Sequence, residues 1–120
     1  MTIKRVAVAA VAAVLLSGQV EADGFRTITD KDSFVSLVEG RQLTRLGIRL
    51  DVSPAGQITG KAFGRDVTGA WDWNGGFFCR DLYYGSQDLG PNCQLVQVNG
   101  STVRFIADRG AGQSADLNLK

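Results

Sequence analysis

Apolar and polar positions alternate along most of the chain from Arg41 onward, with the period of two that is typical of strands with one buried face. Clusters of turn-forming residues interrupt this alternation six times, at residues 53–56, 63–66, 74–75, 85–91, 99–100 and 108–112. The pattern therefore predicts about seven strands joined by short connections, which is typical of an antiparallel meander.

One segment before the strands has a helical period instead. Phe34, Leu37 and Val38 are spaced as i, i+3 and i+4, so they lie on one face of a helix. Either Thr29 or Asp30 can cap its first turn, and Gly40 can end it. The sequence therefore predicts one short helix near the N-terminus.

The dipeptides Asn74-Gly75 and Asn99-Gly100 are the strongest turn signals in the chain. A two-residue type I′ turn requires positive φ at both central positions, which asparagine and glycine tolerate. We expect each dipeptide to form the loop of a hairpin. The resulting registers pair Trp71 with Phe78, and Val96 with Val103.

These registers place one set of large apolar side chains on a single face, which is the predicted core. Its members are Val67, Trp71, Trp73, Phe78, Leu82, Val96, Val98, Val103 and Phe105. The opposite face is mainly polar, through Thr68, Asp72, Asp81, Gln97, Thr102 and Arg104. Three apolar residues also lie on that second face, Phe77, Leu95 and Ile106, and we expect the helix to cover them.

Glycines add to the predicted shape of the sheet. Gly60 and Gly69 would lie opposite each other if the turn between their strands is tight, and paired glycines in strands permit strong coiling. The fold class predicted from the sequence is thus mainly β, an antiparallel meander of about seven strands curved into a small barrel or half-barrel, with one short N-terminal helix.

The first 22 residues have the composition of an export signal. Lys4-Arg5 precede the uncharged apolar run Val6–Leu16, and Val20-Glu21-Ala22 carries small residues at the two positions that a signal peptidase recognises. The apolar run is shorter than the roughly 20 residues that a membrane-spanning helix needs. We expect residues 1–22 to be cleaved as a signal peptide, leaving residues 23–120 as one domain.

Charge then limits the classes of partner. Loss of Lys4, Arg5 and Glu21 would leave 11 basic and 11 acidic side chains, interspersed along the sequence. Such a chain has no basic patch for nucleic acid or for an anionic membrane surface. We therefore expect no nucleic-acid partner and no stable membrane anchor after cleavage.

Cys79 and Cys93 are the only two cysteines. An exported chain enters an oxidising compartment in which a single pair usually closes, so we expect a disulfide between them. A redox-active dithiol is disfavoured because the spacing is not Cys-X-X-Cys.

The chain contains no histidine, which excludes imidazole-based catalysis and most zinc and haem sites. The segment Asp108–Gly112 resembles half of a dinucleotide fingerprint, but no alternating βαβ pattern surrounds it. We predict no catalytic residues, no metal and no cofactor.

Arg80 is the charged residue that the predicted register directs inward, on the same face as Phe78 and with Gln94 close by. In one interpretation it lies near the barrel mouth and reaches water or an acidic residue such as Asp88. In the other, it belongs to a pocket for a small anionic or amphipathic ligand. The residues predicted to line that pocket are Arg80, Gln94, Tyr84, Trp71 and Trp73.

Three segments carry a resemblance to a known family: Gly69–Arg80 with the pattern Gly-x-Trp-x-Trp followed by Phe-Cys-Arg, Asp88–Cys93 with the second cysteine, and Ser101–Gly110 with Phe-x-x-Asp-Arg-Gly. Together they resemble a family of small exported alphaproteobacterial proteins over residues 55–119. Members of this family are commonly labelled dihydrodipicolinate reductase. That label implies an oxidoreductase that uses NAD(P)H.

The leading interpretation is an exported, periplasmic or secreted, non-catalytic binding module with lipocalin-like or half-barrel curvature, which binds a small anionic or amphipathic ligand or an envelope protein. One alternative is a protein similar to periplasmic lysozyme inhibitors, with Gly85–Pro91 as the loop that enters the partner enzyme. Further alternatives are the reductase activity that the family label implies and a purely structural role in the envelope.

Overall fold

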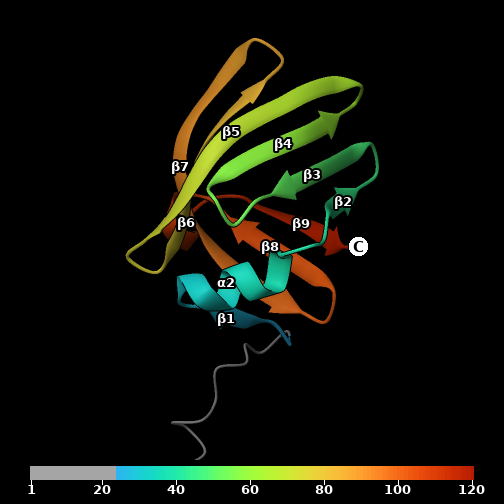
Figure 1. The fold of residues 1–120 in the computed structure, drawn as a ribbon. Helices are drawn as coiled ribbons and strands as arrows, with labels where there is room; N and C mark the ends of the chain where they lie inside the picture. Colours follow the sequence, from blue (N-terminus) through green and yellow to red (C-terminus); the bar gives the residue numbers. More distant parts are fainter. Residues whose placement is uncertain (1–23) are drawn as a thin grey trace, which may run out of the picture.

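The computed structural model describes residues 24–120 (Figure 1). The predicted signal peptide, residues 1–22, lies outside the described residues. The helix is α2 (Lys31–Val38), and a short 3-10 turn, η1, spans Asp108–Gly110. The strands are β1 (Arg26–Ile28), β2 (Leu43–Arg45), β3 (Ile48–Val52), β4 (Gln57–Ala62), β5 (Arg65–Asn74), β6 (Phe77–Tyr84), β7 (Gln87–Asn99), β8 (Thr102–Ile106) and β9 (Ser114–Leu119).

Strands β2 to β9 form a closed, all-antiparallel meander barrel. Each strand pairs with the next in the chain, and β9 pairs back with β2, where Leu119 is opposite Leu43. β1 is an additional strand that pairs with β7 at Ile28–Val96, beyond the point where β6 has ended. The predicted mainly β meander is confirmed, and the sheet closes rather than forming a half-barrel.

The predicted helix is confirmed together with its cap. The Asp30 carboxylate accepts hydrogen bonds from the Ser33 backbone N–H at 3.0 Å and the Ser33 hydroxyl at 2.8 Å. These bonds favour the ionised form, the backbone bond most strongly, so they lower the Asp30 pKa from its ordinary value. At the other end Gly40 adopts φ 73°, the left-handed conformation that commonly follows a helix.

Helix α2 lies across one end of the barrel, as the lower part of Figure 1 shows. The fully buried Phe34 ring lies 5.0 Å from the Phe78 ring and 5.2 and 5.3 Å from the rings of Trp71 and Trp73. The expectation that α2 covers the apolar residues of the outer face is therefore wrong. Two of those residues, Phe77 and Leu95, lie beside η1 instead.

The predicted core face is confirmed. Seven of its nine residues are buried, and Trp73 and Leu82 are partly buried against the same cluster. One predicted surface residue, Gln97, is buried as well, because β1 pairs alongside it and its side-chain amide lies 3.4 Å from the Thr27 hydroxyl.

Both predicted hairpins form, but each loop lies one residue further along the chain. Gly75 and Gly76 form the first loop, so Trp73 pairs with Phe78 and Trp71 with Arg80. Both glycines have positive φ, and glycine reaches that region more readily than Asn74 does. A one-residue displacement of the loop changes the cross-strand partner by two residues, so every side chain keeps its predicted face.

The second hairpin shows the same displacement. Gly100 and Ser101 form its loop, and Val96 pairs with Phe105 instead of Val103. Positive φ is adopted by Gly100 but not by Ser101, which matches the type II′ pattern rather than the type I′ turn predicted for Asn99-Gly100.

Two further predictions about the strands are wrong in detail. The first predicted strand is divided by a tight turn at Leu46–Gly47, and the predicted break at residues 85–91 narrows to a turn at Gly85–Ser86. Gly60 and Gly69 do not lie opposite each other, because the turn between their strands is Phe63–Gly64.

The Cys79–Cys93 disulfide is confirmed. The two cysteines are direct cross-strand partners in β6 and β7, with Cα atoms 3.9 Å apart. Phe78 pairs with Gln94 next to them, as the sequence predicts. The disulfide thus joins the two strands that carry Arg80 and Gln94.

Candidate functional site

The barrel contains a cavity of about 340 Å³, whose exposed lining residues Gln113 and Ser114 lie beside η1, at the end of the barrel opposite α2. We call this end the mouth; it is where the β2–β3, β4–β5 and β6–β7 turns and η1 lie. The cavity is lined mainly by inward-facing apolar residues from β2, β3, β4, β8 and β9: Leu43, Leu50, Val52, Ile58, Phe105 and Leu117. Period-two alternation brings these residues together, because the inner positions of every strand face the same lumen.

Polar side chains occupy only part of this cavity. Gln113 and Ser114 are exposed and line it near η1, whereas Arg80 and Gln94 enter it from the strands β6 and β7. No hydrogen bond from the Gln94 side chain to any residue within 24–120 is present. The site therefore combines an apolar interior with one cation, two amides and one hydroxyl group.

Arg80 is half-buried, and its Nη1 donates a hydrogen bond of 2.8 Å to the Gly90 carbonyl oxygen. Within residues 24–120 it forms no salt bridge. Burial removes water from the guanidinium and so lowers the pKa of Arg80, an effect that the nearby Asp81 carboxylate partly offsets. Since a guanidinium has five N–H donors, most of its capacity is left for water or for a ligand.

Two of the five residues predicted for a ligand pocket, Arg80 and Gln94, line this cavity. Arg80 and Trp71 also line a second hollow on the outer surface. Trp71 and Trp73 belong to the closed end, where their indole N–H groups donate to the carbonyl oxygens of Ser53 at 2.8 Å and Thr29 at 3.4 Å. Tyr84 does not line the cavity either. Its ring lies under the Arg65 guanidinium, 4.7 Å from ring centroid to Cζ.

A reciprocal pair of hydrogen bonds holds η1 beside the mouth. The Asn92 amide donates to the Asp108 carboxylate at 2.8 Å, and the Asp108 backbone N–H donates to the Asn92 side-chain oxygen at 3.0 Å. Asp108 and Arg109 both have positive φ, at 55° and 54°. The sequence marks this segment as a break between strands but gives no signal that Asn92 positions it.

A second cavity, of about 620 Å³, lies on the outer surface between η1 and strands β5–β7. It contains the disulfide together with Asp72, Asp81 and Arg109. The Oδ1 atom of Asp81 is buried there, with no hydrogen-bond partner in the described part of the chain. This hollow is wide and mixed in charge, so it defines a ligand class less clearly than the lumen does.

The chain matches no protein-family model, no curated protein and no solved structure. In the described residues, His, Cys, Asp and Glu side chains form no group of three or more that could hold a metal ion. None of the helices described is both long enough and apolar enough to cross a membrane.

Proposed function

We propose that this protein is a non-catalytic binding module that holds a small amphipathic carboxylate in its barrel. The observation that carries the proposal is Arg80, a half-buried cation without a salt-bridge partner in residues 24–120, at the wall of a mainly apolar cavity. The proposed arrangement has the ligand carboxylate at Arg80 and Gln94 and the apolar part against Leu50, Ile58 and Leu117.

The energetics of the cavity support this class of ligand. Removing a cation from water is costly unless a counter-charge and hydrogen bonds replace the lost hydration. A carboxylate supplies both, because it can accept two parallel N–H bonds from one guanidinium. A volume of about 340 Å³ also lies near the lower end of the range of about 300–1,000 Å³ found for small-molecule sites.

The proposed location is the periplasm or the extracellular space. Two observations support it: the signal-like composition of residues 1–22 and the disulfide between Cys79 and Cys93.

An NAD(P)H-dependent reductase is the alternative that the family label implies. A dinucleotide site of the Rossmann type needs a parallel β–α–β unit and a helix N-terminus for the pyrophosphate. All strand pairs of residues 24–120 are antiparallel, which favours the binding proposal. A saturable rise in melting temperature with NADPH would support the reductase instead.

A protein partner, as for lysozyme inhibitors, is the second alternative. It is favoured by the β6–β7 ribbon, which carries the exposed side chains of Tyr83 and Leu89 near its turn. Shortening this ribbon at Gly85–Ser86 and testing the inhibition of a lysozyme would separate this alternative from ligand binding in the lumen.

Calorimetric titration with dodecanoate tests the main proposal. We expect saturable binding of dodecanoate and weaker binding of dodecyltrimethylammonium, because the latter presents a cation to Arg80. Arg80→Leu should weaken dodecanoate binding by at least about tenfold, the loss expected for one charge-assisted hydrogen-bonding partner. Arg26→Leu, at an exposed arginine of β1, is the matched control. The proposal would be contradicted if wild type, Arg80→Leu and Arg26→Leu bound dodecanoate equally, or if the wild type did not bind it.

A further inference from the structure

Two neighbouring turns at the mouth expose large apolar side chains. Leu46, in the β2–β3 turn, is 93% exposed, and Phe63, in the β4–β5 turn, is 70% exposed. The turns lie side by side, since the Phe63 backbone N–H donates to the Gly47 carbonyl oxygen at 2.7 Å. The Phe63 ring covers Gly47 so closely that a Cβ added there would lie 2.6 Å from Cε1.

Phe63 is an unusual residue for this turn. Its φ is 51°, in the left-handed region that glycine, asparagine and aspartate populate and that bulky side chains rarely adopt. Phe63 buries little of its ring and has an unfavourable backbone conformation, so folding stability does not explain a phenylalanine at this position. The combination points to a role at the surface.

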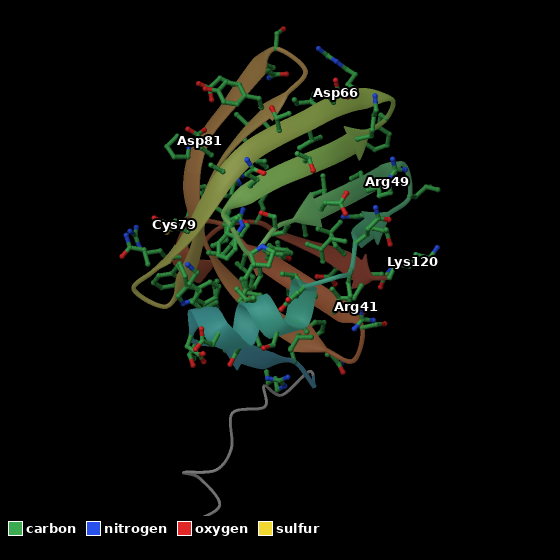
Figure 2. All side chains as sticks on the ribbon, viewed as in Figure 1. Arg41, Arg49, Asp66, Cys79, Asp81 and Lys120 are labelled. Atoms are coloured by element: carbon green, nitrogen blue, oxygen red, sulfur yellow. A yellow bond between two sulfur atoms is a disulfide. The ribbon has the colours of Figure 1, made fainter. Side chains whose placement is uncertain are left out.

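Cations surround these two turns. Arg45 and Arg49 flank Leu46, while Lys61 and Arg65 flank Phe63, and all four are exposed. Figure 2 shows Arg49 and Asp66 beside the turns. The carboxylate of Asp66 is the only acidic group within residues 45–49 and 61–66, and it lies 2.8 Å from Lys61.

The Asp116 carboxylate also lies near this surface. Its pKa is lowered chiefly by its hydrogen bond with Arg104, and the charge of Arg45 contributes as well. Arg104 holds both carboxylate oxygens, at 2.8 and 3.1 Å. The turns therefore keep a net positive charge around two exposed apolar side chains.

We propose that Leu46 and Phe63 form a docking surface for an anionic phospholipid bilayer. Apolar tips flanked by Lys and Arg are the combination that binds the headgroup region of such bilayers. Two protruding side chains are too small for a stable protein interface, which buries about 800 Å² on each partner. The charges are spread along the sequence, so only folding brings them together. Docking here would turn the mouth toward the bilayer, yet the inference does not depend on ligand binding in the lumen.

Flotation with vesicles tests the proposal. All variants are prepared with the same N-terminus, so that any contribution of residues 1–23 to vesicle binding is the same for each of them. Vesicles of phosphatidylglycerol and phosphatidylcholine are compared with vesicles of phosphatidylcholine alone. The informative substitutions are Phe63→Asn, which creates the favoured Asn-Gly turn and so preserves the fold, and Leu46→Ser. Leu89→Ser removes an apolar side chain that is 48% exposed on the β6–β7 ribbon, at the same end of the barrel but outside these two turns, and is the matched control.

We expect binding to the anionic vesicles that falls about tenfold when Phe63→Asn and Leu46→Ser are combined, and that is unchanged by Leu89→Ser. Lys61→Gln should reduce this vesicle binding by about fivefold, the contribution of one cation near an anionic surface, whereas Arg26→Gln at the closed end should not.

The Arg80→Leu protein should still float with the anionic vesicles, which separates this inference from the proposed function. Absence of binding, or equal binding by the Phe63→Asn, Leu46→Ser protein, would overturn it. A self-association that Phe63→Asn abolishes, seen by sedimentation without flotation, would overturn it in favour of a second copy of the chain.

Discussion

Nη1 of Arg80 lies 2.8 Å from the carbonyl oxygen of Gly90, and this is the one hydrogen bond that the guanidinium makes within residues 24–120. A single hydrogen bond from a charged donor contributes about 1.5–3 kcal/mol, and the desolvation of the half-buried cation opposes this contribution. Ligand binding and folding stability are therefore expected to depend on Arg80 in different ways.

The first prediction concerns Arg80→Leu. Leucine removes both the hydrogen bond and the desolvation cost, so the free energy of unfolding in urea should stay within about 1 kcal/mol of the wild-type value or rise. Loss of about 3 kcal/mol or more would identify Arg80 as a structural residue and weaken the case for a ligand site.

The second prediction concerns the closed end of the barrel. Phe34 is fully buried among the rings of Trp71, Trp73 and Phe78, so Phe34→Ala should lower the free energy of unfolding by about 3–5 kcal/mol. Ser36→Ala, at an exposed position of the same helix, is the control and should change it by less than about 0.5 kcal/mol. Similar effects of the two substitutions in urea unfolding would show that α2 does not close the core.

The third prediction concerns the disulfide. The Cys79–Cys93 link closes a short segment between positions 14 residues apart. Replacing both cysteines by serine should lower the free energy of unfolding by about 3 kcal/mol according to the chain-entropy estimate. The circular dichroism spectrum of the native state should remain that of a β protein, because the β6–β7 pairing extends well beyond the disulfide. A change below about 1 kcal/mol would contradict the prediction.

The fourth prediction concerns pH. The hydrogen bonds from Arg104 lower the Asp116 pKa in the folded protein, so the ionised carboxylate stabilises the fold above the unfolded-state pKa of about 3.9. That contribution should be lost as the pH falls from about 5 through the lowered native pKa. It should be small, since Asp116 is substantially exposed and surface ion pairs are weak. Urea unfolding of wild type and Asp116→Asn should therefore converge in acid, and parallel pH profiles would contradict the assignment.

The sequence predicts the face of most side chains correctly because, within a strand, residues an even number of positions apart lie on the same face. The hairpin loops at Gly75–Gly76 and Gly100–Ser101 are each displaced by one residue, yet the buried set is unchanged. The turn at Leu46–Gly47 is missed for a different reason. Leucine is not a typical turn residue, and the alternation continues through this segment, so the sequence alone favours one longer strand.

The candidate site is predicted less completely, because alternation gives the face of a residue but not its height along the barrel axis. Arg80 and Trp71 are cross-strand partners on the inner face. Arg80 nevertheless reaches the cavity, while Trp71 packs under Phe34 at the closed end. Only the three-dimensional position of α2, which a helical period cannot supply, separates residues that close the barrel from residues that line its lumen.

An NMR titration of the ¹⁵N-labelled chain with dodecanoate tests the central claim most directly. The account predicts saturable shift changes at amides around the lumen, those of Leu50, Ile58, Gln94 and Leu117, and their loss in Arg80→Leu. Absence of any shift, or changes confined to the turns that carry Leu46 and Phe63, would contradict a binding site inside the barrel.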